Sequence, residues 1–313
     1  MTSEPRPTLA RIGIVLLNLI APGAGLVRLG RWRAGLGLLL LIFVALGLRL
    51  IVYAFGPPLG FRAFAALLIL MLVALLVSLV LSMALSWRYS RLRSGGSAAW
   101  WSRWYALAAL LLLSMAAANR LGAAADAEYK TYYIPSKSMM PTLVENDRLV
   151  VRKGIPADLC RGDVIAFQTP VGDYVHRVAA LAGDRIAMRG GVVLLNGRPV
   201  AQREVGRATV EAWDGEPGEA VQLAERFPGE AQDHRIYDLG STPQDDMPEQ
   251  TVAPGHVFVL GDNRDMAADS RIDHDLEGVE QLPISRIRGR ALFILWSGDR
   301  RKIGAALSME AKP

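Results

Sequence analysis

Apolar residues are concentrated before position 120, in runs long enough to cross a membrane. Three of these runs could each span a hydrocarbon core of roughly 30 Å as a helix: residues 34–55, 63–87 and 101–119. Residues 12–27 are a weaker segment, because Asn18 and the Pro22-Gly23 pair interrupt the run. We therefore expect a membrane anchor over residues 1–120, with three transmembrane helices and a first segment that is re-entrant, interfacial or kinked.

Arginine-rich loops give these helices an expected orientation. Arg28, Arg31 and Arg33 follow the weak segment, and further arginines separate the second and third spans. Basic loops favour the cytoplasmic side of a membrane. With three crossings, everything after about residue 120 lies on the outer face.

Beyond residue 120 the pattern changes from helical to strand-like. Short β-branched or apolar runs are separated by Gly, Pro, Asn and Asp, at residues 148–152, 163–167, 174–181, 192–195, 257–260 and 290–296. Such runs predict a β-sheet domain over residues 121–300. Asn196-Gly197 predicts a hairpin turn. Residues 202–250 are polar, acidic and rich in Gly and Pro, so we expect an insertion with little regular structure, and residues 301–313 read as a C-terminal tail.

Composition agrees with two unlike halves. The 313 residues are 51% hydrophobic and 21% charged, with a net charge of +5 that comes mostly from arginines beside apolar runs. Basic loops beside membrane helices explain this charge more simply than nucleic-acid binding does. The single Cys160 excludes an internal disulfide and offers no metal cluster. We expect no metal, no cofactor and no nucleic-acid partner.

A pair of serines follows the last apolar run, in the segment Ile134-Pro135-Ser136-Lys137-Ser138. Two residues that are two positions apart, with one residue between them, lie on the same side of an extended backbone. One hydroxyl could therefore attack a substrate while the other donates a hydrogen bond. Taken alone, such a segment is more often a rigid turn, so the interpretation depends on the motifs that follow.

Three further segments follow in order, namely Arg161-Gly162-Asp163-Val164-Ile165-Ala166-Phe167, Tyr174-Val175-His176-Arg177-Val178 and Gly261-Asp262-Asn263-Arg264-Asp265-Met266-Ala267-Ala268-Asp269-Ser270-Arg271. With the serine segment, they closely resemble the type I signal peptidases of the S26 serine protease family, over nearly all of residues 130–297. The resemblance implies transmembrane helices followed by a mainly-β extracytoplasmic catalytic domain. It also implies a membrane-bound serine endopeptidase that removes signal peptides from exported precursors after small residues, in an Ala-x-Ala pattern. We expect a multi-pass protein of the bacterial inner membrane, with a periplasmic or extracytoplasmic catalytic domain.

The resemblance also assigns catalytic roles. By motif match Ser138 is the nucleophile, and Ser136 helps the Ser138 backbone N–H to hold the oxyanion. His176 stands where the commonest bacterial enzymes have a lysine base. A histidine at this position is similar to the endoplasmic-reticulum and archaeal branch of the family, which uses a Ser-His pair. Neutral imidazole, with a reference pKa of about 6.5, is competent as a base at neutral pH.

A histidine base prefers a carboxylate on its other ring nitrogen, which fixes the tautomer and stabilises imidazolium. Asp269 and Asp262 are the candidates, and we favour Asp269, although the equivalent aspartate of the Ser-Lys enzymes pairs with the arginine that matches Arg271. Ala267 stands where those enzymes have a serine that positions the lysine. The remaining histidines, His234, His256 and His274, are expected to have no catalytic role.

An extended substrate is expected to pair with strand edges near Ile134-Pro135 and Tyr174-Val175. The implied partners are membrane-tethered precursors and the lipid bilayer, and the sequence does not indicate an oligomeric state. Two alternatives stay open. One is a processing peptidase dedicated to a single client, such as a pilin or conjugation protein, and the other is a catalytically inactive scaffold that binds signal peptides.

Overall fold

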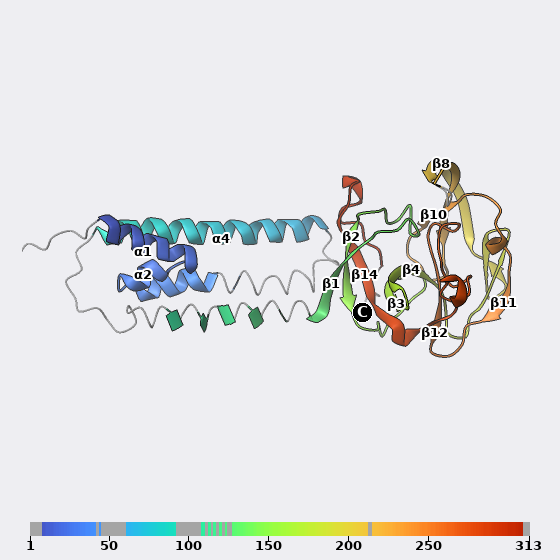
Figure 1. Cartoon of the computed structure of the whole chain (residues 1–313), viewed down its shortest axis with the longest axis horizontal. Coiled ribbons are helices and arrows are strands. Elements are labelled where there is room, and N and C mark those ends of the chain that lie inside the picture. Colours follow the sequence, from blue (N-terminus) through green and yellow to red (C-terminus); the bar gives the residue numbers. More distant parts are fainter. Residues whose placement is uncertain are drawn as a thin grey trace, which may run out of the picture. The chain divides into compact units, whose positions relative to one another are not determined.

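The computed structural model of the chain describes residues 8–41, 44, 61–91, 108–109, 112–113, 115–116, 119–120, 123, 127–211 and 215–308. It divides into two units, Met1–Ala127 and Glu128–Pro313 (Figure 1). The boundary therefore follows the expected end of the membrane anchor by a few residues.

The first unit is helical, with α1 (Thr8–Ile20), α2 (Ala24–Arg28) and α4 (Phe61–Ser90). Asn18 stabilises the break between α1 and α2, because its Oδ1 accepts hydrogen bonds from the backbone N–H groups of Gly23 and Gly25, at 3.0 and 3.2 Å. Its Nδ2 donates to Ser86 Oγ on α4, at 3.0 Å. Residues 12–27 thus contain a helix break closed by a buried amide, and the membrane topology of this segment stays a prediction.

One expected membrane span falls within the described residues in full. Helix α4 contains residues 63–87, and its Leu68–Ser90 portion is long and apolar enough to cross a membrane. The expected spans 34–55 and 101–119 lie largely outside the described residues, although Trp32–Leu41 forms a short apolar helix. Three crossings therefore stay a prediction.

The second unit is built around a seven-stranded antiparallel sheet in the order β1-β2-β14-β3-β4-β12-β13. Its strands are β1 (Tyr129–Tyr133), β2 (Arg148–Lys153), β3 (Val164–Thr169), β4 (Gly172–Leu181), β12 (His256–Leu260), β13 (Leu282–Pro283) and β14 (Ile287–Trp296). Alternate residues of β3 enter different apolar clusters. Val164 and Ala166 pack in one, while Ile165 and Phe167 pack in the other. Both faces of the sheet are therefore covered, which explains the continuous apolar runs in the sequence.

A four-stranded sheet in the order β11-β5-β6-β7 packs beside it. It consists of β5 (Arg185–Arg189), β6 (Val192–Leu195), β7 (Arg198–Pro199) and β11 (Met247–Thr251). Asn196 and Gly197 connect β6 to β7 with positive φ angles of 54° and 77°. Two consecutive positive φ values are what a two-residue hairpin of this kind requires, so the predicted turn is confirmed.

The expectation of little regular structure in residues 202–250 is wrong. This segment forms most of a three-stranded sheet in the order β10-β9-β8, with β8 (Ala201–Glu211), β9 (Pro217–Arg226) and β10 (His234–Asp238), and it also provides β11. Small apolar side chains are interspersed with charged ones along β8 and β9, and most residues of β8 are exposed or half-buried. Val210, Ala220 and Tyr237 form its small core, where Met140 also packs.

The expected C-terminal tail is likewise part of the fold as far as residue 308. Leu307 is buried in the same cluster as Met139 and its N–H donates to Leu292 O at 2.9 Å, while Ser308 Oγ accepts from the N–H of Val164 at 2.9 Å. Residues 309–313 lie outside the described residues. Short 3-10 helices complete the unit at η2 (Pro243–Asp245), η3 (His274–Leu276), η4 (Ile284–Arg286) and η5 (Arg300–Lys302).

Candidate active site

The serine loop follows β1 and brings two hydroxyls together. Ser136 Oγ and Ser138 Oγ are 3.1 Å apart, as the one-residue spacing predicts. Ser136 is exposed and Ser138 is half-buried. Met139, only 1% exposed, and the fully buried Leu143 anchor the loop in the core of the large sheet. The loop is therefore fixed by packing while its hydroxyls stay accessible.

Segment Gly261–Asn263, directly after β12, holds the backbone of this loop. Asn263 N–H donates to Ser138 O at 3.0 Å, and Asn263 Nδ2 donates to Lys137 O at 3.1 Å. A Cβ on Gly261 would lie 2.7 Å from Ser138 O and 2.2 Å from the Cβ of Ala267. Only glycine permits this close approach. The last sequence motif thus sets the direction of the peptide groups beside Ser138.

His176 lies on β4, opposite Ile165 of β3 and one residue before the position where β12 begins to pair. Its ring contacts those of Phe167 and Tyr174, with centroids 5.6 and 5.9 Å apart. The side chain is 2% exposed, and this burial lowers the pKa of His176 to about 4, against a smaller upward effect of two nearby carboxylates. At neutral pH the imidazole is therefore uncharged.

Neither expected carboxylate hydrogen-bonds to this imidazole. Within the described part of the chain, His176 Nδ1 is buried without a hydrogen-bond partner. Asp269 instead accepts from Gly261 N–H at 3.0 Å and from the guanidinium of Arg271 at 2.9 Å. Burial alone would raise the pKa of Asp269, but Arg271 outweighs burial and lowers it. The predicted bond from Asp269 to His176 is thus replaced by an ion pair, because a guanidinium offers two parallel donors.

Asp262 is occupied in the same way. It accepts from Arg177 Nε and Nη2 at 2.8 and 2.7 Å, and from the hydroxyl of Thr142 in the serine loop. Burial would raise the pKa of this carboxyl, and the adjacent Arg177 lowers it below its usual range. Asp262 therefore ties β4 to the serine loop, a role that the sequence did not reveal.

Comparison with known proteins explains why these motifs occur together. A family model described as "Signal peptidase, peptidase S26" matches residues 101–296. The chain belongs to the S26 signal peptidase family. The resemblance inferred from the sequence motifs is thus confirmed, and the chain is a peptidase of that family.

Named relatives of this S26 peptidase come from several bacteria. The chain is 31% identical over 182 residues to "Probable signal peptidase I-1" of a Synechocystis species, covering 54% of this chain and 71% of the relative. It is 33% identical over 147 residues to "Signal peptidase I" of Bacillus caldolyticus, covering 46% and 69%. A crystal structure of a signal peptidase I from Enterococcus faecalis matches with 21% identity and a TM-score of 0.25, over 44% of this chain and 98% of that one.

The S26 peptidase has an open strand edge near His176. Strand β12 pairs with β4 only at Arg177–Leu181, so among the described residues no strand pairs with β4 on that side before position 177. Tyr174 and Val175 lie on this free edge. By contrast, Ile134 is already engaged, because its N–H donates to Asp147 O at 2.9 Å and its carbonyl accepts from Asn146 N–H at 2.8 Å. Pro135 is exposed and has no N–H to offer.

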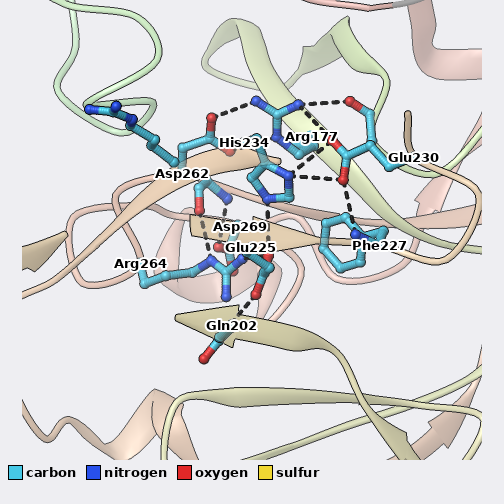
Figure 2. Close-up of polar contacts among 12 residues, drawn as sticks. Arg177, Gln202, Glu225, Phe227, Glu230, His234, Asp262, Arg264 and Asp269 are labelled. Carbon is cyan, nitrogen blue, oxygen red and sulfur yellow. Dashed lines mark hydrogen bonds and ion pairs between the residues drawn. The ribbon is translucent and has the colours of Figure 1, made fainter. Parts of the chain in front are cut away.

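The β8–β10 sheet reaches the serine loop of the S26 peptidase. Lys137, between the two serines, pairs with Glu211 at the end of β8 at 2.6 Å, so its ammonium group is engaged by β8. His234 of β10 lies in a buried charged group, which we call the His234 network (Figure 2). Its members are His234, Glu225, Glu230, Arg264, Arg177 and Asp262. No motif in the sequence marked His234, since its partners are distant in the chain or lie in the supposed insertion.

Proposed function

We propose that this S26 peptidase is a membrane-anchored serine endopeptidase that removes signal peptides from exported precursors after small residues. The observation that carries the proposal is the 3.1 Å separation of the Ser136 and Ser138 hydroxyls, in a loop whose carbonyls are held by Asn263. Relatives named signal peptidase I support the substrate class. An attacking hydroxyl beside a second hydroxyl donor is the arrangement that acyl transfer needs.

In the proposed mechanism Ser138 attacks the scissile carbonyl, and its own N–H and the Ser136 hydroxyl stabilise the oxyanion. Neutral His176 takes the Ser138 proton, gives it to the leaving amine and then activates water for deacylation. The support for His176 is its motif position and its neutrality, which follows from burial. Among the described residues no hydrogen bond joins Ser138 to His176, and catalytic hydrogen bonds commonly tighten when substrate binds.

Asp269 is proposed to act on His176 through its charge. Of the two carboxylates that raise the pKa of the imidazole, Asp269 has the larger effect and Asp262 the smaller. The positive charge of Arg271 opposes both. An imidazolium formed during the reaction would thus be stabilised through space, while the tautomer is left to the packing of the ring.

We propose that the precursor binds as an added strand along the free edge at Tyr174 and Val175. An extended peptide there would form main-chain hydrogen bonds and present alternate side chains to the site. Small residues would be selected where those side chains meet the protein. The proposed setting is the bacterial inner membrane, with α4 as one of several spans, the catalytic unit outside the cytoplasm, and the bilayer holding enzyme and precursor together.

The test is cleavage of a membrane-tethered Ala-x-Ala precursor by the full chain in detergent, comparing wild type with Ser138→Ala and His176→Ala. Loss of the correctly cut product in both folded variants supports the proposal. Loss of cleavage in Ser138→Ala but not in His176→Ala would mean that His176 is not the base. A wild type that cuts none of several precursors contradicts general processing, and a panel of single-client precursors then separates a dedicated peptidase from an inactive scaffold.

A further inference from the structure

Both ring nitrogens of His234 face carboxylates. The side chain is 5% exposed, with Nδ1 2.9 and 3.0 Å from the two oxygens of Glu230 and Nε2 3.0 Å from Oε2 of Glu225 (Figure 2). A neutral imidazole has one N–H, so one nitrogen would set its lone pair against a carboxylate oxygen. Only the doubly protonated ring donates a hydrogen bond at both positions.

The charges around the ring also indicate that His234 is doubly protonated. The other members of the His234 network are three carboxylates and two guanidinium groups: Glu225 of β9, Glu230 before β10, Asp262 after β12, Arg177 of β4 and Arg264. An imidazolium balances this buried set, whereas a neutral ring would leave one negative charge without a partner, which is costly in a protein interior. Burial and Arg177 would lower the pKa of His234, but the bonds to Glu225 and Glu230 outweigh them and raise it.

We propose that His234, held as an imidazolium, is a positioning residue for the peptidase site, an inference that rests on the proposed function above. It touches neither Ser138 nor His176. It acts by holding the segment after β12 that supports the serine loop. Two chains of contacts and one strand pairing connect His234 to that segment.

The first chain runs through Glu225. This carboxylate accepts from His234 and also from Nη2 of Arg264. The Nε of Arg264 in turn donates to Gly261 O at 3.2 Å. Gly261 is the residue whose close approach to the Ser138 carbonyl leaves no room for a side chain.

The second chain runs through Glu230, whose carboxylate lies 3.7 Å from Nη1 of Arg177. Arg177 holds Asp262 with two hydrogen bonds, and Asp262 accepts from Thr142 of the serine loop. His234 thereby balances the charge at the start of both chains.

Strand β10 also pairs with the segment after β12. Tyr237 N–H donates to Asp262 O at 2.8 Å, and Arg264 N–H donates to Tyr237 O at 3.0 Å. The strand that carries His234 therefore pairs directly with the segment that both chains reach. A shift of this segment would move the peptide beside Ser138, and a displacement of about 1 Å at a catalytic group can cost on the order of 100-fold in rate.

The first experiment compares His234→Gln with wild type, as full chains in detergent, by kcat and KM against pH on a tethered precursor. We expect kcat to fall by on the order of 100-fold with KM nearly unchanged. The wild-type kcat should also fall as the pH rises through the raised pKa of His234, and this alkaline decline should be absent from His234→Gln. His256→Gln is the matched control, since His256 contacts the carbonyl of Pro254 and lies outside the network.

A charge-balanced variant separates positioning from general damage. In His234→Gln combined with Glu230→Gln, two guanidinium groups face two carboxylates again, so much of the lost kcat should return. Unchanged kcat in folded His234→Gln, or no recovery in the double variant, overturns the inference.

The protonation state is measured directly in wild type by NMR of labelled histidine in the full chain, without relying on any variant. A doubly protonated His234 at neutral pH is expected, and a neutral ring overturns the inference. The two levels of failure are distinguishable. If the Ser138→Ala variant still cleaves the precursor at the wild-type rate, the proposed function is overturned and the positioning role with it. If cleavage depends on Ser138 but is unchanged in His234→Gln, only the positioning role is overturned.

Discussion

Gly261 and Ser138 are so close that a Cβ on residue 261 would lie 2.7 Å from the Ser138 carbonyl oxygen. Gly261→Ala should therefore displace the serine loop and cost roughly 1 to 3 kcal/mol of stability, with a loss of cleavage on the order of 100-fold. Cleavage rate and urea unfolding test both effects. Gly298→Ala is the matched control, because nothing lies within 4 Å of a Cβ there. Full activity in Gly261→Ala would show that the loop tolerates the displacement.

Ser136 offers a second prediction. If its hydroxyl stabilises the oxyanion, Ser136→Ala should lower kcat by roughly 100 to 1000-fold and leave KM almost unchanged, since the interaction forms only in the transition state. Ser136→Thr, which keeps a hydroxyl, should recover part of the rate. Equal losses in kcat for both substitutions would point to loop packing as the cause.

The acid limb of activity should lie unusually low. If His176 is the base, its pKa, which burial lowers to about 4, keeps it neutral well below pH 7, and kcat/KM should decline only as the pH falls through that value. The measurement is a pH profile of wild-type cleavage with enzyme stability checked at each pH. A limb close to the ordinary histidine pKa of about 6.5 would contradict the assignment of buried His176 as the base.

Stability should depend on pH with opposite signs at the two buried histidines. The folded-state pKa of His176 is depressed, so the unfolded chain binds that proton first and stability falls as the pH drops from about 6.5 towards 4. The folded-state pKa of His234 is raised, so its contribution is complete below the unfolded pKa and is lost as the pH rises through the folded one. Unfolding midpoints against pH should flatten on the acid side in His176→Gln and on the alkaline side in His234→Gln. The same flattening in both variants would refute this assignment.

Asp262→Asn should destabilise the catalytic unit strongly. The substitution leaves the buried guanidinium of Arg177 without its bidentate partner, and removing one member of such a pair costs about 3 to 5 kcal/mol. Urea unfolding of the full chain in detergent measures the change. Asp299→Asn provides the comparison, because it breaks the solvent-accessible pair with Arg301 and should have little effect. An equally small loss of unfolding free energy in both variants would contradict this prediction, because it would mean that the charge of Arg177 is screened as well as that of a surface arginine.

Local patterns in the sequence predicted the features that depend on local physics. The apolar runs of β3 and β4, the Asn196-Gly197 turn and the serine spacing each follow from neighbouring residues, and the motif order was enough to indicate the family. The sheet of residues 201–238 was missed because its strands mix charged and polar residues with small apolar ones and show no clear two-residue alternation.

Long-range ion pairs were beyond sequence reasoning. Arg177 and Asp262 are 85 positions apart, and Glu225 joins Arg264 across 39 positions. Asp269 was expected to accept a hydrogen bond from His176. Its carboxylate instead accepts two hydrogen bonds from the guanidinium of Arg271, two residues along the chain. The choice among partners for a buried charge depends on tertiary geometry, which no spacing rule supplies.

The unpaired edge of β4 also bears on solubility and self-association. Exposed main-chain groups on a strand edge are a template for joining two copies of a protein edge to edge. This edge is short, begins at a glycine, and has Asp173 near its start, where Lys130 of β1 donates to its carboxylate at 3.4 Å. Charge near the start of this edge disfavours docking of a second identical edge, so the edge of β4 is protected against edge-to-edge association of two copies.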